Sequence, residues 1–416
     1  MQEYDLVIIG GGMVGASLAA ALLPVAETLG LRMALVEAQP LPQDGKGEPR
    51  FTPSYDARST ALAQGVRTLY RRMGIWDALE QHLTPIQTIH VSEQGRFGTT
   101  RLRAEEESVP ALGYVVENHW LGQVLISHLQ ASKSPCLELI SPAEVTGLTP
   151  VSSGQQVQLQ LEGEPRELQA QLVVMADGGR SALRERMGIH YTEQAYGQHA
   201  LVANVSLDRS HRNVAYERFT PGGPVALLPT ESVSGQPRCG LVWTLSDAAL
   251  EEVLMLDDAA FLERLQATFG YRAGRFVAVG ERFHYPLKLA LAQEQARSGL
   301  VVLGNAAHAL HPIAGQGYNL ALRGVVALAD LILQRQRDGL PLGAIEGLRS
   351  FVDQRREDQQ RTIGFSDLTL KAFTSDNPLL RMGRAGALQA LDICPVAKTL
   401  FARAAMGLDQ PAARLR

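Results

Sequence analysis

Short apolar runs separated by a glycine-rich turn open the chain. Residues 4–9 are apolar and rich in β-branched side chains, as expected for a buried strand of a parallel sheet. Residues 13–23 predict an apolar helix, which we expect to end near Pro24 because proline cannot continue the hydrogen-bond ladder. A second apolar strand is expected at residues 33–36. The order strand, helix, strand predicts an α/β fold that begins with a Rossmann-like unit.

Alternating apolar positions mark the middle of the chain. Residues 157–172 alternate on both sides of the turn Gly163-Glu164-Pro165, and predict a hairpin that runs into a buried strand at 172–175. Residues 300–303 predict another buried strand, followed by a long amphipathic helix at 318–333. Further β-rich runs lie at 201–207, 214–219, 225–228 and 241–245. Together with residues 83–108, these runs predict a mixed β-sheet.

A chain of 416 residues is too long for one ordinary core, so we expect two domains and a C-terminal helical region. The first domain is expected to be discontinuous in sequence and to carry the Rossmann-like unit. The second contains the mixed sheet. The expected limits are 1–82, 109–185 and 281–345 for the first domain, 83–108 and 186–280 for the second, and 346–416 for the helical region.

Composition excludes several classes of protein. The formal net charge is −4, which gives no electrostatic reason to expect nucleic-acid binding. Cys136, Cys239 and Cys394 are far apart, and we expect reduced thiols of a cytoplasmic protein and neither disulfides nor a zinc site. The longest apolar stretch, residues 16–26, contains a proline and is shorter than the roughly 20 residues of a membrane span. The chain is expected not to cross a membrane, although it could lie on one.

The glycine turn after the first strand predicts dinucleotide binding. Gly10 permits the tight turn, Gly12 allows the backbone to approach a pyrophosphate, and Gly15 allows helix and strand to pack closely. The second strand ends in Glu37, where an acidic residue can accept hydrogen bonds from ribose hydroxyls. Glycine-rich turns also occur in other α/β proteins, but the strand, the helix and Glu37 together favour a dinucleotide.

Two further glycine segments follow predicted strands. Asp177-Gly178 ends the strand at 172–175, where ligands commonly meet α/β sheets. Gly304-Asn305 ends the strand at 300–303, and the loop from His311 to Gly317 leads into the long helix. The positive end of that helix points at whatever binds in the loop. His308 and His311 have no carboxylate or cysteine beside them, so we expect loop packing and no metal site.

These three segments, in this order, resemble the flavoprotein aromatic hydroxylases of the p-hydroxybenzoate hydroxylase type. That family carries GxGxxG, a middle Asp-Gly and a late Gly-Asp followed by Pro-x-x-Gly-Gln-Gly. The resemblance covers about residues 4–345. It implies a glutathione-reductase-like FAD-binding domain, a mixed β-sheet substrate domain and a C-terminal helical segment.

Within the family, the chain is most similar to the hydroxylases of ubiquinone biosynthesis. The stretches that carry this similarity are 56–62, Val115-Val116-Glu117-Asn118, 216–220, Leu227-Leu228-Pro229 and 304–317. Asn305 stands where the family usually has Asp. The hydroxylases of 2-polyprenyl-6-methoxyphenol are similar to this chain in having Asn at this position. The resemblance therefore implies that a polyprenylated phenol is hydroxylated at ring carbon 1.

The resemblance also implies the cofactors and the site. FAD is resident, NADPH or NADH docks transiently as reductant, and O2 reacts to a flavin C4a-hydroperoxide that the phenol attacks. Arg58 matches an arginine near the isoalloxazine, and the loop of His311 and Pro312 lies by the reactive flavin edge. No residue is assigned as a general base. The expected cofactor-binding residues are Gly10, Gly12, Gly15, Glu37, Arg58, Gln123, Asp177, Gly178, Gly304, Asn305, Gly315, Gln316, Gly317 and Asn319.

Several alternatives stay open. The enzyme could hydroxylate another ring position or a different phenol, or reduce prenyl double bonds. It could also be a flavin-bound scaffold among other ubiquinone-biosynthesis proteins, and a homo-oligomer is possible. The basic and apolar segment 379–388 indicates either a helix packed on the protein or a surface that touches anionic lipid. The second reading would place the protein on the inner face of the cytoplasmic membrane.

Overall fold

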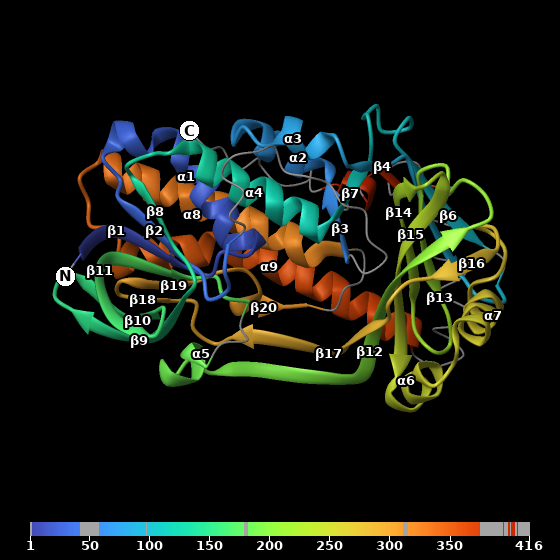
Figure 1. The fold of residues 1–416 in the computed structure, drawn as a ribbon. Coiled ribbons are helices and arrows are strands. Elements are labelled where there is room, and N and C mark those ends of the chain that lie inside the picture. Colours follow the sequence, from blue (N-terminus) through green and yellow to red (C-terminus); the bar gives the residue numbers. More distant parts are fainter. Residues whose placement is uncertain are drawn as a thin grey trace.

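The computed structural model describes residues 2–41, 58–96, 98–178, 182–310 and 315–374, and residues 394, 398–399, 401–403 and 406. Two large sheets lie at opposite ends of the molecule, and long helices cover the first of them (Figure 1). A small three-stranded sheet lies between the helices and the second large sheet (Figure 1).

The first large sheet is built around parallel strands. Its main path runs β18-β19-β11-β1-β2-β8, in which every neighbouring pair except β18 and β19 is parallel. The antiparallel strands β9 and β10 extend from β11. The bounds are β1 Gln2–Ile9, β2 Met33–Val36, β8 Leu137–Ile140, β9 Ala143–Val151, β10 Gly154–Leu161, β11 Glu164–Met175, β18 Ala296–Arg297 and β19 Leu300–Val302.

Four helices pack beside this sheet and on one another. They are α1 Met13–Leu29, α4 Asn118–Ser132, α8 Gln316–Arg337 and α9 Ile345–Thr374. The apolar side chains between them and the parallel strands form the largest core of the described residues. Among the helices that the structure describes, none is long and apolar enough to span a membrane.

The prediction that the first helix ends near Pro24 is wrong. Helix α1 continues to Leu29 and ends at Gly30, which adopts the left-handed conformation and donates its N–H to the carbonyls of the last turn. The Pro24 ring is exposed, while Ala26 beyond it is completely buried. We infer that the packing of the later residues outweighs the one hydrogen bond that proline removes.

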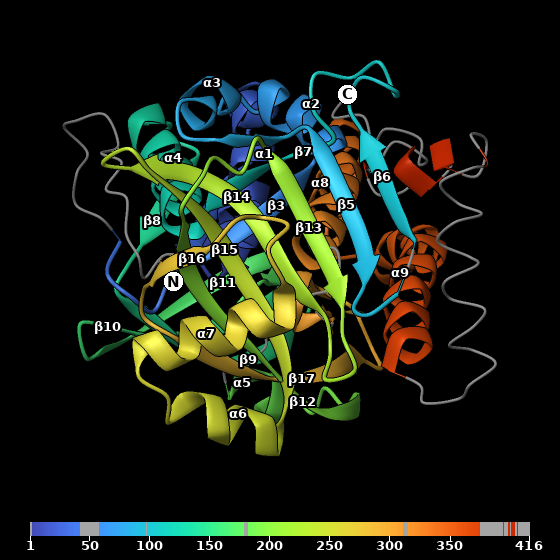
Figure 2. The same cartoon turned by 90° about the vertical axis from the view of Figure 1, so that its right-hand side faces the viewer.

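The second large sheet is mostly antiparallel. Its path is β20-β17-β12-β15-β14-β13-β5-β6, with β16 beside β12, and only β13 and β5 run parallel. Helices α6 Asp247–Leu254 and α7 Asp258–Phe269 cover one face, in front of the sheet in Figure 2. The bounds are β5 Thr88–Glu93, β6 Thr99–Arg103, β12 Tyr191–Leu207, β13 Val214–Phe219, β14 Val225–Val233, β15 Gln236–Ser246, β16 Phe276–Val279, β17 Phe283–Ala292 and β20 His308–Ala309.

The small sheet joins the two parts of the molecule. It contains β3 Ser59–Ala63, β7 Gly113–Glu117 and β4 Thr84–Ile86, in the order β3-β7-β4. Glu117 at the end of β7 accepts a hydrogen bond of 2.9 Å from Arg238 of β15, and Arg238 is completely buried. Moving the two sheets apart would leave each of these charges buried without its partner. The pair therefore fixes the position of the small sheet on the second large sheet.

The fold class expected from the sequence is confirmed: a Rossmann-like parallel unit, a mixed second sheet and a long helix toward the C-terminus. The domain limits stay a prediction. The basic segment 379–388 lies outside the described residues.

Candidate flavin-binding and active site

Five neighbouring parallel strands end in register at one edge of the first sheet. Their paired terminal residues are, in order, Val302, Met175, Ile9, Val36 and Ile140. The chain after each strand continues the pairing: Ala176 N donates to Ile9 O at 2.8 Å, and Leu303 N to Met175 O at 2.9 Å. Because all five ends meet at this edge, the three glycine segments that lie far apart in sequence become neighbours.

The first segment is packed too tightly for side chains at two of its glycines. Gly10 has φ +105°, and a Cβ there would lie 2.7 Å from the Ala176 carbonyl oxygen. A Cβ at Gly15 would lie 1.9 Å from the Gly10 carbonyl oxygen. These glycines therefore hold the first turn against the second segment and against helix α1, as the sequence predicts.

Gly12 differs from these two glycines because it faces open space. A Cβ at Gly12 would meet no atom within 4 Å. Gly12 is the N-cap of α1, and no side chain caps the helix. The Glu37 carboxylate lies beside this turn and accepts hydrogen bonds from Gly11 N at 2.6 Å and from Gln39 N at 2.8 Å. Free helix N–H groups beside an oriented carboxylate suit a phosphate with an adjoining ribose.

The second and third segments complete the same edge. Asp177 is half-buried, and Gly178 has φ +78° with open space around its Cα. Gly304 has φ +66°, and a Cβ there would touch the Val14 side chain at 3.0 Å, which places the third segment against the start of α1. Asn305 is exposed in a short 3-10 turn. The expected residues His311 and Pro312 lie outside the described residues.

His308 lies deep beneath the third segment. It is 4% exposed, and burial lowers its pKa to about 4, so that the imidazole is neutral at physiological pH. Across the described ranges, no group of three or more His, Cys, Asp or Glu side chains is arranged to hold a metal ion.

Asn319 ties the start of α8 to strand β3. Its Oδ1 accepts from Ala63 N at 2.8 Å, and its Nδ2 donates to the carbonyls of Ala61 and Gly315, each at 2.9 Å. Gly315 is the N-cap of α8, with φ +62°, and its Cα lies close to the Ala61 side chain. Both N–H groups of the amide are engaged by backbone, so Asn319 holds the start of α8 on β3 and has no N–H left to donate to a ligand.

The other positions at this helix end differ in exposure. Gln316 is nearly buried, whereas Gly317 faces open space. The N-terminus of α8 thus offers unobstructed backbone, as does the N-terminus of α1.

Arg58 lies where the small sheet meets the second large sheet. Its guanidinium carbon is 5.3 Å from the centre of the Tyr285 ring on β17. Its backbone carbonyl accepts from Asn118 N at 2.8 Å, and the adjacent Ser59 side chain lies 3.6 Å from where a Gly240 Cβ would be. The arginine and Ser59 therefore lie against β17 and β15 of the second sheet, on the face opposite α6 and α7.

Gln123 of α4 has one buried polar atom without a hydrogen-bond partner among the described residues. Its Nε2 is 2.8 Å from the His119 ring nitrogen, whereas its Oε1 is buried and has no hydrogen-bond partner among the described residues. A buried carbonyl oxygen without a partner is costly, so it is a candidate acceptor for a bound group.

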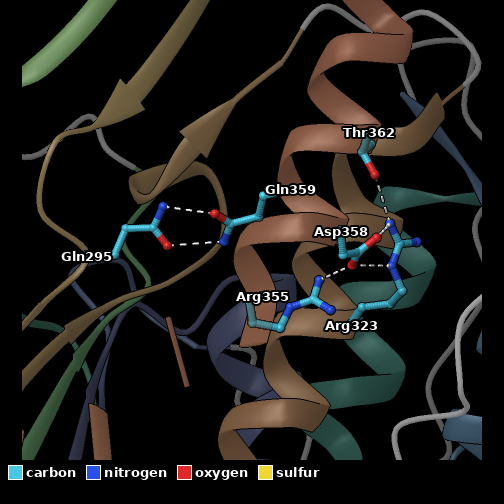
Figure 3. A network of polar contacts seen from close by, with 6 residues as sticks. All are labelled: Gln295, Arg323, Arg355, Asp358, Gln359 and Thr362. Carbon is cyan, nitrogen blue, oxygen red and sulfur yellow. Dashed lines mark hydrogen bonds and ion pairs between the residues drawn. The ribbon is translucent and has the colours of Figure 1, made fainter. Parts of the chain in front are cut away.

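An ionic network between α8 and α9 was not predicted from the sequence. Arg323 Nε donates to Asp358 at 2.9 Å, Arg355 pairs with the same carboxylate, and Gln295 and Gln359 exchange two hydrogen bonds of 3.1 Å (Figure 3). Burial alone would raise the pKa of Asp358, but the hydrogen bonds and charges of the two arginines lower it. The partners are 35 or 64 residues apart in sequence or share one helix, so no local pattern signals the network.

Comparison with known proteins identifies the class. The family model described as FAD binding domain matches residues 3–356, and the chain belongs to this family. A curated relative, ubiquinone hydroxylase UbiL of Rhodospirillum rubrum, is 34% identical over 97% of this chain and 89% of its own. The 3-demethoxyubiquinol 3-hydroxylase of Escherichia coli is 29% identical over 98% and 99%, and the human mitochondrial ubiquinone biosynthesis monooxygenase COQ6 is 26% identical over 96% and 92%.

Solved structures share the fold at low sequence identity. The p-nitrophenol 4-monooxygenase PnpA of Pseudomonas putida has a TM-score of 0.78 at 17% identity, over 98% of this chain and 99% of its own. PqsL of Pseudomonas aeruginosa has a TM-score of 0.72 at 20% identity, over 93% and 99%. The expectation of an FAD-binding fold is confirmed. The uncapped N-terminus of α1 offers N–H donors and the oriented Glu37 carboxylate offers an acceptor, a combination that fits FAD.

Proposed function

We propose that this protein is an FAD-dependent monooxygenase that hydroxylates the aromatic ring of a polyprenylated phenol in ubiquinone biosynthesis. The substrate is 2-polyprenyl-6-methoxyphenol and the position is ring carbon 1. The observation that carries the proposal is the convergence of three glycine segments at one sheet edge, in a chain that is 34% identical to a ubiquinone hydroxylase.

The chain's own residues suit a resident FAD. The start of α1 at Gly12 receives the pyrophosphate, and Glu37 receives a ribose hydroxyl. The strands β11 and β19 end at the same edge, and the start of α8 lies against the start of α1, where Tyr318 Oη donates to the Met13 carbonyl at 3.4 Å. The N-terminal end of α8, at Gly317, carries partial positive charge and would favour negative charge on a flavin bound beside it.

When it is bound, FAD that NADPH or NADH has reduced supplies one oxygen atom of O2 to the phenol ring. The protein orients the ring and excludes water. Arg58, at the boundary between the flavin edge and the second sheet, positions the flavin relative to the substrate. The buried His308 has a pKa lowered to about 4 and therefore takes up no proton at physiological pH.

The assignment of ring carbon 1 as the hydroxylated position rests on the resemblance carried by Asn305. The name of one relative states a ring position, since the Escherichia coli relative is a 3-demethoxyubiquinol 3-hydroxylase. The test is mass spectrometry of quinone lipids in cells that lack the gene and in cells complemented with wild type or Arg58→Ala. Accumulation of 2-polyprenyl-6-methoxyphenol in the deletion strain supports ring carbon 1. A different accumulated intermediate moves the reaction to another position, and normal ubiquinone in the deletion strain rejects the pathway.

A further inference from the structure

The face of the second large sheet opposite α6 and α7 carries one acidic side chain in an apolar row. Paired residues of neighbouring strands point to the same side of a sheet, so the row can be followed from strand to strand. Glu217 of β13 pairs with Val91 of β5 and with Ala226 of β14. The pairing continues through Val242 to Val202 and Phe283. Glu217 is the one ionisable member of this row.

This row faces away from the helices that cover the sheet. The alternate positions, including Tyr216, Leu227 and Leu241, pack in the core beneath α6 and α7. In contrast, Val91, Glu217, Ala226, Val242, Val202 and Phe283 are all only half-buried. Two residues along the same face, Ile89, Ala215 and Leu228 pack against Ala402 and Met406, so the row borders a covered part of the sheet. A half-buried apolar row outside that core is the kind of surface that receives an apolar ligand.

The row lies beside the proposed reaction site. Ser59 lies against Gly240, which is two residues from Val242 on the same face of β15, and Arg58 reaches to Tyr285, two residues from Phe283 on β17. Arg58 and Ser59 therefore bracket the part of the row formed by β15 and β17. Glu217 is two strands farther along the row, about 10 Å from Val242 at the usual strand spacing. One substituted phenol ring spans most of that distance.

Glu217 has no structural partner that explains its place. It has no hydrogen bond or ion pair among the described residues, and burial raises the pKa of its carboxyl to about 7. On the same face, Glu93 lies at the end of β5 beside Phe219, and Arg58 lies over Tyr285. The charged neighbours Arg101 and Arg218 alternate to the opposite face. An acid that costs stability and faces a site is better explained by function than by folding.

We propose that Glu217 accepts the proton of the substrate's phenol hydroxyl. This inference rests on the proposed function and supplies the proton acceptor that the sequence did not identify. The phenol O–H bond breaks, a new O–H bond forms on the carboxylate, and the electron pair stays on the phenol oxygen. The phenolate so formed donates electron density into the ring, which prepares the ring for attack on electrophilic oxygen. A base with a pKa near the working pH suits this task.

The test uses the flavin-loaded full chain and 2-prenyl-6-methoxyphenol as a short-chain probe. Ultraviolet difference spectra report the ionisation of the bound phenol without turnover. In the wild type we expect the bound phenol to ionise well below the value of about 10 that is usual for a phenol. In Glu217→Gln it stays neutral over that range, and kcat falls about 100-fold or more with little change in KM. Glu217→Asp restores part of both signals.

Glu252→Gln is the matched control, because it makes the same change on α6, behind the same sheet. We expect it to behave as wild type. A Glu217→Gln protein that holds flavin and shows the wild-type phenolate spectrum and pH profile overturns the assignment of Glu217 alone. A wild type that ionises the bound phenol and yields no hydroxylated product overturns the proposed function, while the spectra of the variants still decide the role of Glu217.

Discussion

The side-chain amide of Asn319 bridges the N-cap residue Gly315 of α8 and the backbone of β3. It thereby couples the start of α8 to the strand that follows Arg58. Asn319 is 2% exposed, so water has no access to replace it at its three backbone partners. This bond network places the start of α8 and the small sheet in one fixed relationship.

Removing this amide is expected to destabilise the protein and to weaken flavin binding. Asn319→Ala leaves buried backbone groups of Ala61 and Ala63 without partners, and we expect a loss of roughly 2–4 kcal/mol in the free energy of unfolding. Urea denaturation of the flavin-free protein measures this loss. Gln334→Ala, at an exposed position of the same helix, should change stability by less than about 0.5 kcal/mol. Equal stability of the two variants would contradict the bridging role.

Substitutions at Gly12 and Gly15 are expected to impair different properties of the protein. Gly12→Val places a branched side chain in open space, so the fold should persist while the pyrophosphate position is blocked. Gly15→Ala puts a Cβ against the Gly10 carbonyl and should destabilise the protein by roughly 2 kcal/mol or more. The ratio of flavin to protein absorbance and the thermal midpoint of the apoprotein separate the two effects. Full flavin content in Gly12→Val would refute the placement of the phosphates.

Removing the buried carboxylate of Asp358 should destabilise the protein far more than removing the exposed carboxylate of Glu357. Asp358→Ala leaves Arg323 and Arg355 as buried charges without a counterion, and we expect a loss of about 3–5 kcal/mol. Glu357→Ala breaks a solvent-exposed pair with Arg361 and should cost about 0.5 kcal/mol at most. Denaturant titration of both variants tests the difference.

The same carboxylate predicts a dependence on pH. The pKa of Asp358 is lower in the folded state than its ordinary value of 3.8. Its contribution to stability is therefore complete above that value and is lost as the pH falls through the folded pKa. Below that range, wild type and Asp358→Ala should approach each other in stability.

The carboxyl group of Glu217 predicts the opposite dependence of stability on pH. Its folded pKa is raised from 4.5 to about 7, so ionisation opposes folding, and the stability of the wild type should fall as the pH rises between these values. The shift corresponds to at most about 3 kcal/mol, and the half-buried position reduces our expectation to roughly 1 kcal/mol. Glu217→Gln should therefore be more stable than wild type above pH 7 and equal to it below the lower value. Thermal melts at several pH values would reveal the growing difference in stability between the two proteins as the pH rises. A difference that does not change with pH would count against a buried, unpaired acid.

Membrane association is tested best by charge reversal and not by truncation. Ala402 and Met406 are buried beside β6 and β7, so removing the end of the chain uncovers a core. We expect Arg381→Glu with Arg384→Glu to lower co-sedimentation with anionic phospholipid vesicles several-fold, because each basic side chain near such a surface contributes about 1 kcal/mol. Neutral phosphatidylcholine vesicles are the control. Unchanged sedimentation would favour a helix packed on the protein.

The sequence by itself determined the elements whose signals are local. The first strand, the Gly10 turn and Glu37 follow from short-range patterns of apolar residues and glycines, and strand ends in a parallel sheet meet at one edge by geometry. The extension of α1 past Pro24 was missed, since only the packing of Ala26 against distant helices sustains it.

Tertiary structure alone decided the contacts between residues far apart in the chain. The bridge from Asn319 to β3 and the pairing of Arg323 with Asp358 join segments that no local pattern relates. Glu217 lay within a stretch noted for its β-rich pattern and its family resemblance, and its significance depends on which face of β13 it occupies and on the strands beside it. Sequence periodicity assigns a side chain to one of two faces, whereas the pairing of strands and the placement of helices determine which face is covered.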